Sequence, residues 1–183
     1  SSAASDVYKR QDEGGTNRAI YLANVLGLDM GMFYKRRDYT QIVNGRNPIV
    51  AHEFLGSSVE GKDVIIIDDM ISSGDSIIEV ATELKRRKAK RIFAAATFGL
   101  FTNGLDKFDQ AYEDGTISGI LTTNLIYQTP ELLSRPYYIN CDMSKYIALI
   151  IDTLNHDGSI SSILSPDERI QHVLQKYKNG ETI

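Results

Sequence analysis

Residues 64–78 limit what this chain can fold into more than any other stretch. They open with four β-branched residues in a row, Val-Ile-Ile-Ile at 64–67, which is typical of a strand buried on both faces within a parallel sheet. A short segment of Ser, Gly and Asp follows, and apolar side chains then recur at helical spacing at Ile77, Val80, Ala81 and Leu84. The stretch therefore predicts a strand, a polar loop and a helix, which together are one half of a βαβ unit.

The polar loop at residues 72–76 has the chemistry of a phosphate site. The first N–H groups of a helix have no partner within the helix, and the helix dipole is positive there, so an anion is stabilised at that end. Three serine hydroxyls add donors, and Gly74 lets the backbone come close to a ligand.

Two carboxylates, Asp68 and Asp69, follow the apolar run directly. Open α/β sheets bind ligands at the carboxyl ends of their strands, and carboxylates beside a phosphate suit sugar hydroxyls or a divalent cation. A plainer interpretation is also open, in which the two aspartates only end a strand and Ser76 only caps a helix.

Length and composition favour one soluble domain. The chain has 183 residues, of which 24% are charged and 42% apolar, as expected for one α/β domain with a single core. A net charge of −4 argues against a nucleic-acid partner held by bulk electrostatics. Apolar runs such as residues 146–151 are far shorter than the about 20 residues that a membrane span needs. No secretory leader opens the sequence, so we expect a cytoplasmic protein.

The two ends of the chain differ from its middle. Residues 1–11 are Ser/Ala-rich at the start and lack an apolar period, so we expect a non-native or disordered leader outside the fold. Residues 12–164 are expected to form the domain. Residues 165–183 predict an amphipathic helix and tail, with Ser165 as the cap, and the pattern leaves open whether this helix packs on its own domain or on another subunit.

Further elements are expected on both sides of the central unit. A loop at residues 12–16 should precede a helix with Thr16 as a possible cap, and a helix at residues 143–154 should turn its apolar side chains inward. The other expected strands are residues 30–34, 91–97, 117–123 and 137–139, and the other expected helices lie near residues 105–112 and after Thr129.

The chain resembles a known family in several motifs. The apolar run, Asp68-Asp69, two apolar residues and the loop at 72–76 look like the phosphoribosyl-diphosphate signature of the type I phosphoribosyltransferase fold. The motifs at residues 12–15, 35–37, 122–124 and 156–164 are similar, in the same order, to the carboxyl-terminal domain of the ribose-phosphate pyrophosphokinase family. The resemblance implies an α/β fold with a central, mostly parallel sheet and helices on both faces.

The same resemblance implies an activity and a set of site residues. The family transfers a diphosphoryl group from ATP to ribose 5-phosphate with Mg²⁺, giving phosphoribosyl diphosphate and AMP. By resemblance, Lys35 and Arg37 stabilise the transferring phosphoryl groups from a flexible loop. Asp12, Gly14 and Gly15 would form a diphosphate loop, with Asp12 near the Mg²⁺. The residues implied to bind ribose 5-phosphate are Arg37, Asp68, Asp69, Ser72, Ser73, Gly74, Asp75 and Ser76.

The resemblance also implies partners. Family members have an amino-terminal domain that supplies much of the ATP site, and they assemble as dimers built into hexamers. This chain would then be the ribose-5-phosphate-binding half, inactive alone.

Two departures from the family pattern keep other functions open. Phe98 stands where the family has His, and Asp75 stands where it has a small uncharged residue. An acid in the loop would repel a phosphate unless its side chain points away. A stand-alone phosphoribosyltransferase and a non-catalytic, synthetase-associated regulatory subunit remain as alternatives.

Overall fold

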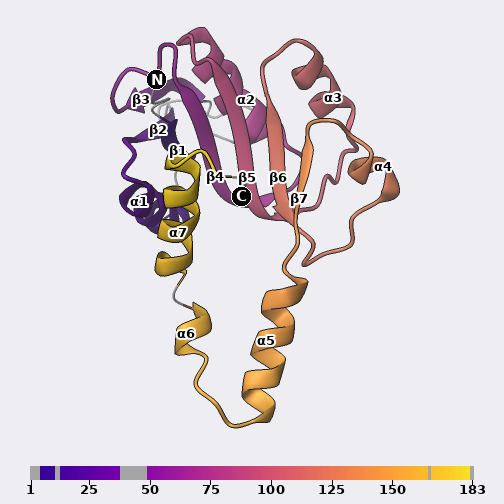
Figure 1. Ribbon diagram of the computed structural model, residues 1–183. Coiled ribbons are helices and arrows are strands. Elements are labelled where there is room, and N and C mark those ends of the chain that lie inside the picture. The colour runs from indigo at the N-terminus through magenta and orange to yellow at the C-terminus, as the bar shows by residue number, and fades with distance from the viewer. Residues whose placement is uncertain (1–4, 11–12, 38–48, 165, 182–183) are drawn as a thin grey trace.

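A seven-stranded sheet forms the centre of the molecule, in the order β3-β2-β1-β4-β5-β6-β7 (Figure 1). The computed structural model describes residues 5–10, 13–37, 49–164 and 166–181. All neighbouring strands are parallel except β2 and β3, which are antiparallel. The strands are β1 (Ser5–Arg10), β2 (Met30–Arg37), β3 (Ile49–Leu55), β4 (Asp63–Ile71), β5 (Arg91–Gly99), β6 (Gly119–Thr123) and β7 (Tyr138–Cys141).

Helices cover both faces of this sheet because alternate residues of β4 point to opposite sides. Val64 and Ile66 lie in a large core with α2 and α3, while Ile65 and Ile67 pack with Ala19 of α1. This arrangement confirms the expected fold class. The helices are α1 (Glu13–Leu26), α2 (Asp75–Arg86), α3 (Asp106–Glu113), α4 (Pro130–Leu133), α5 (Ser144–Asn155), α6 (Ser161–Leu164) and α7 (Asp167–Lys178).

Strand β4 continues past the two aspartates, so the interpretation that they end the strand is wrong. The strand keeps its pairing with β5 through Met70 opposite Phe98 and Ile71 opposite Gly99. Ile71 is fully buried, which anchors the end of the strand in the core. The loop proper is therefore residues 72–74, and Asp75 already begins α2.

Residues 1–4 and 11 lie outside the described residues, but strand β1 places residues 5–10 inside the fold and so corrects the expectation of a leader outside the fold for this part. The strand lies between β2 and β4 and is parallel to both, with Val7 opposite Met30 on one side and Ile65 on the other. A strand between two neighbours is held by backbone hydrogen bonds on both edges, and those bonds require no apolar periodicity. The sequence pattern therefore gave no sign of it.

Helix α1 begins earlier than expected. It starts at Glu13, so Gly14 and Gly15 belong to its first turn, and Thr16 is not its cap. Asp12 lies outside the described residues.

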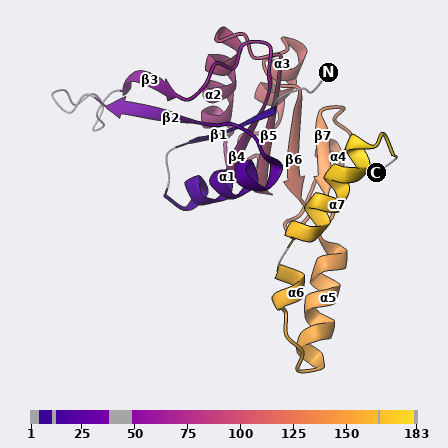
Figure 2. The same cartoon turned by 60° about the vertical axis from the view of Figure 1, so that its left-hand side comes forward.

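The carboxyl-terminal helices leave the body of the molecule and return to it. Figures 1 and 2 show α5 and α6 extending beyond the end of the sheet and α7 beside α1. The expectation that Tyr146, Ile147, Ile150 and Leu154 point inward is wrong, because the sheet does not reach α5 and none of its residues is buried. Leu154 is 59% exposed.

Helix α7 packs on α1 of the same chain, which answers the question that the sequence left open. The Tyr21 hydroxyl donates to Asp167 at 2.5 Å, and the Gln171 amide donates to the Val25 carbonyl at 2.9 Å. The helix begins at Asp167, after Pro166, and Ser165 lies outside the described residues. In the described part of the chain, no helix is both long and apolar enough to cross a membrane.

Candidate functional site

The connection from β4 to α2 has the geometry of an anion site. Gly74 is left-handed at φ 83° and ψ −11°, and its carbonyl accepts the Ile78 N–H at 3.0 Å. This bond makes Gly74 the N-cap of α2, so the N–H groups of the first helical turn face the loop at residues 72–74. Ser76, in that first turn, is half-buried. The loop thus presents backbone donors at the positive end of a twelve-residue helix.

An aromatic layer supports this loop from beneath. A Cβ atom on Gly74 would lie 2.1 Å from Cζ of Phe108, so the ring touches the glycine directly. Phe108 is fully buried and packs edge-on against Phe101, with the ring centroids 5.1 Å apart. Only glycine fits at position 74, both for its φ angle and for this contact.

The connection from β5 to α3 holds the loop from the side. The Leu100 N–H donates to the Ile71 carbonyl at 2.8 Å, and the Thr102 N–H donates to the Ser72 carbonyl at 3.1 Å. The hydroxyls of Ser72 and Thr102 lie 3.5 Å apart. Sequence reasoning missed Thr102, although adjacent parallel strands end at the same edge of a sheet and so bring their following loops together.

Asp68 and Asp69 lie at the same edge and interact with each other. The Asp69 N–H donates to Oδ1 of Asp68 at 2.9 Å. A hydrogen bond with the Asp68 side chain lowers the pKa of Asp69, and the positive charge of Arg18 on α1 lowers it further. Arg18 is a second residue that the sequence did not single out. The charged form of Asp69 is therefore favoured, and a carboxylate at this edge suits hydroxyl groups or a cation.

The Asp75 carboxylate is engaged away from the centre of the loop. The Ser73 hydroxyl donates to its Oδ2 at 2.8 Å, and the Lys107 ammonium of α3 donates to Oδ1. The hydrogen bond from Lys107, followed by that from Ser73, lowers the pKa of Asp75. The acid that departs from the family pattern is thus held by a cation from the next helix.

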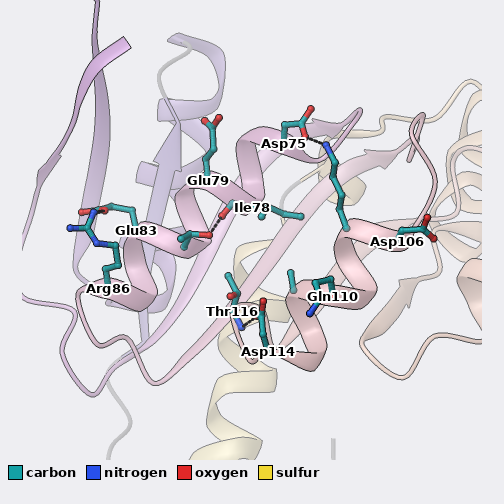
Figure 3. Close-up of a pocket in the computed structure, with 12 residues that line it drawn as sticks. Asp75, Ile78, Glu79, Glu83, Arg86, Asp106, Gln110, Asp114 and Thr116 are labelled. Carbon is teal, nitrogen blue, oxygen red and sulfur yellow. Dashed lines mark hydrogen bonds and ion pairs between the residues drawn. The ribbon is translucent and has the colours of Figure 1, made fainter. Parts of the chain in front are cut away.

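A hollow of about 780 Å³ lies between α2 and α3, and Asp75 stands at one end of it (Figure 3). Glu79, Glu83, Asp106 and Asp114 also line this hollow, so its charge is wrong for a phosphate. The loop at residues 72–74, and not this hollow, is therefore the candidate anion site.

The order of the strands marks the same place independently. The chain runs from β1 through α1 to β2 on one side of the sheet and from β4 through α2 to β5 on the other. The order therefore reverses between β1 and β4, which are parallel neighbours. Ligands of open α/β sheets bind at the carboxyl ends of the strands where such a reversal occurs.

This reversal brings two of the expected loops to one edge. Gly14 and Gly15 follow the carboxyl end of β1, and Ser72, Ser73 and Gly74 follow that of β4. The side chains at 13–17 are not described, so the expected role of Asp12, Gly14 and Gly15 stays a prediction.

Lys35 and Arg37 lie in β2 and not in a flexible loop. They pair with β3, Lys35 opposite His52 and Arg37 opposite Ile49. The expectation of a loop is wrong for these two residues because an antiparallel partner, which the sequence pattern did not indicate, extends the strand to Arg37. Their side chains are not described, and the divergent segment that follows, residues 38–48, lies outside the described residues.

The described residues contain no group of three or more His, Cys, Asp or Glu that could hold a metal ion by themselves. Asp68 and Asp69 are two carboxylates at an edge where a phosphate would bind. This donor set fits Mg²⁺, which is held by one or two carboxylates together with substrate phosphates and water.

Comparison with known proteins identifies the family. The family model described as "Phosphoribosyl synthetase-associated domain" matches residues 38–165. The chain belongs to this family. The chain is also similar to the ribose-phosphate pyrophosphokinase of Vibrio parahaemolyticus, with 30% identity over 84% of this chain and 46% of the relative. The corresponding enzyme of Thermococcus kodakarensis is 34% identical over 67% of this chain and 42% of the relative.

A solved structure shares the fold of this phosphoribosyl synthetase-associated domain. The phosphoribosylpyrophosphate synthetase from Mycobacterium smegmatis superposes with a TM-score of 0.66 and 23% identity, over 85% of this chain and 46% of that one. The chain thus spans less than half the length of each of these relatives.

Proposed function

We propose that this chain is the ribose-5-phosphate-binding half of a ribose-phosphate pyrophosphokinase. The observation that carries the proposal is the segment at residues 72–76, the loop and the first turn of α2, which combines a helix N-terminus and hydroxyl donors with two neighbouring carboxylates at the β1/β4 reversal. The names of the similar proteins agree with it.

The parts of the loop have distinct roles in binding the sugar. The 5-phosphate accepts hydrogen bonds from the first N–H groups of α2 and from the hydroxyls of Ser72 and Ser76. Asp68 and Asp69 accept hydrogen bonds from the ring hydroxyls, which orients the anomeric hydroxyl outward. The phosphate end and the hydroxyl end of one ligand thus meet donors and acceptors of the matching kind.

Catalysis of this phosphoryl transfer depends on positive charge around the phosphates more than on covalent catalysis by protein side chains. The anomeric oxygen of ribose 5-phosphate attacks the β-phosphorus of ATP and gives up its proton to solvent. The bond from that phosphorus to the α–β bridging oxygen breaks, and AMP leaves with the electron pair of that bond. Lys35 and Arg37 from β2 stabilise the transferring group, and Arg37 also contacts the sugar phosphate. Asp68 and Asp69 would hold Mg²⁺ together with substrate phosphates, with Asp12 as the further metal residue that the resemblance implies, and the ion would supply positive charge to the phosphates. Gly14 and Gly15 accommodate the diphosphate.

The remaining partners follow from the family. An amino-terminal domain of a longer protein supplies much of the ATP site, and the assembled enzyme is a homo-oligomer of dimers built into a hexamer in the cytoplasm. This chain alone is then a binding domain without activity.

Calorimetric titration with ribose 5-phosphate, and separately with ATP, tests the proposal. We expect binding of the sugar phosphate, no binding of ribose itself, and no binding of ATP. Absence of binding to ribose 5-phosphate would contradict the proposed site. Tight binding of a nucleobase together with phosphoribosyl diphosphate would instead identify a phosphoribosyltransferase.

Replacing Ser73 by Glu tests the location of the phosphate. The added carboxylate stands in the loop, so we expect sugar phosphate binding to be abolished while the fold persists, as judged by circular dichroism. Ser57→Glu is the matched control, because Ser57 is exposed in the loop before β4, at the opposite edge of the sheet. Equal affinities of the two variants would place the phosphate elsewhere.

One observation keeps a non-catalytic, synthetase-associated subunit as a second candidate. Phe98, which replaces the family's His, lies half-buried in β5 opposite Met70 of β4, so no imidazole is available at this position. Under this alternative, the longer protein binds ribose 5-phosphate but forms no AMP from ATP. An assay for AMP with the longer protein separates the two candidates.

A further inference from the structure

We propose that Lys107 determines the phosphate affinity of the loop by neutralising Asp75, so that this ion pair acts as a positioning device for the anion site. The proposal rests on the proposed function, since it concerns the same loop. It explains how a chain with an acid in the first turn of α2 can still hold a sugar phosphate.

The contacts of Asp75 decide the local charge. Asp75 is the first residue of α2, next to the N–H groups that receive the anion. Both of its oxygens are engaged, one by Lys107 and one by the Ser73 hydroxyl at 2.8 Å. Without the ammonium group, a full negative charge would stand beside the bound phosphate.

Among the described side chains that line the hollow, Lys107 also has no equal replacement. The other charged side chains that line the hollow around it are Glu79, Glu83, Asp106 and Asp114, with Arg86 at the far end (Figure 3). Arg86 is engaged by Glu83 at 2.8 Å, and it lies eleven residues further along α2, about 16 Å away at the helical rise. The surroundings are therefore acidic, and Lys107 is the cation placed to compensate Asp75.

Ser73 links the ion pair to the loop. Its hydroxyl proton points to Asp75, so the pair also fixes the rotamer of a loop side chain. Removing the charge of Asp75 weakens this hydrogen bond, so the Ser73 hydroxyl becomes free to donate to the phosphate. Asp75 thus lowers the affinity for the phosphate in two ways. Its negative charge repels the phosphate, and it takes up the hydroxyl donor of Ser73.

A double-mutant cycle on the affinity for ribose 5-phosphate tests the proposal. Lys107→Met is expected to weaken binding about fivefold, the effect of like charges a few ångströms apart in water, and Asp75→Asn is expected to strengthen it by a similar factor. The double variant should return close to the wild-type affinity, and Lys107→Arg should retain it. The loss in Lys107→Met should shrink in high salt, because both side chains are about half exposed, at 53% and 51%.

Arg86→Met is the matched control, since it removes one positive charge from the same hollow away from the loop. We expect its affinity to equal that of the wild type. The proposal is overturned if Lys107→Met and Asp75→Asn change affinity in the same direction or not at all, or if Arg86→Met weakens binding as much as Lys107→Met. Wild-type protein that binds no ribose 5-phosphate would instead refute the proposed function.

Discussion

Single residues set the shape of the loop more than its overall composition does. Gly74 is required twice, by a left-handed backbone and by the Phe108 ring against its Cα. Asp75, which breaks the family pattern, is accommodated by Lys107. The sequence shows the glycine and the acid but not their partners, because Phe108 and Lys107 lie more than 30 residues away in the chain.

Replacing Gly74 by Ala tests the fit of the loop on its support. The new Cβ would meet the Phe108 ring and would force an L side chain into a left-handed conformation. We expect the free energy of unfolding in urea to fall by about 3 kcal/mol and sugar phosphate binding to be lost.

Gly61→Ala is the control for the backbone effect alone. Gly61 has a similar φ of 72°, but an added Cβ meets nothing within 4 Å. We expect a loss of only about 1 kcal/mol and an unchanged affinity. Equal losses in the two variants would show that Phe108 does not support the loop.

Some helices and strands could be predicted from the sequence, and others could not. The buried face of α2, made by Ile77, Val80, Ala81 and Leu84, was predicted correctly because a helix that packs on a sheet carries its own periodicity. Strands β1 and β3 were missed because their pairing with neighbours, and not their side-chain pattern, defines them. The inward face predicted for α5 was wrong, since periodicity shows that a face is apolar but not what covers it.

An ion pair joins the start of β4 to the start of β5 and makes the stability of the fold depend on pH. Arg91 donates two hydrogen bonds to the buried Asp63 carboxylate, at 2.9 and 2.5 Å. The guanidinium lowers the pKa of Asp63. Because the folded pKa is below the unfolded value of about 3.9, the stabilisation is complete above that pH and is lost as the pH falls through the folded pKa.

Asp63→Asn is expected to lower the free energy of unfolding by about 2 kcal/mol at pH 7. The difference from the wild type should diminish below about pH 4, measured by urea unfolding at a series of pH values. Asp29→Asn is the control, because Asp29 is largely exposed and pairs with Lys62 at 3.3 Å, so its replacement should have little effect at any pH. A pH-independent difference for Asp63→Asn would contradict the ion-pair explanation.

At the scale of the whole molecule, the carboxyl-terminal helices form an arm that ends on α1. Helix α7 is held there by the bonds from Tyr21 to Asp167 and from Gln171 to Val25. Helix α1 follows β1 at the site edge, but α7 contacts its carboxyl-terminal half. We therefore expect the arm and the loop at residues 72–74 to behave independently.

Gln171→Ala tests this independence. Loss of the hydrogen bond should raise hydrogen exchange of α7 amides about fivefold, as for one net hydrogen bond, and leave the affinity for ribose 5-phosphate unchanged. Gln175→Ala, on an exposed position of the same helix, is the control for helix propensity. A parallel change in exchange and affinity would mean that the arm and the site are coupled.

The reversal between β1 and β4 also has a consequence for folding. Strand β1, with six residues, joins β2 and β3 to the rest of the sheet through its pairing with β4. In this β1–β4 seam, Ser5 pairs with Asp63, which lies 58 positions further along the sequence, so the pairing is a long-range contact. A chain in which β1 is not paired would keep β4, α2 and β5 together but would lack the segment after β1 on one side of the candidate site. Binding of the sugar phosphate would then require that β1 is paired with β4. Bound ligand would in turn stabilise this pairing and protect it from proteases.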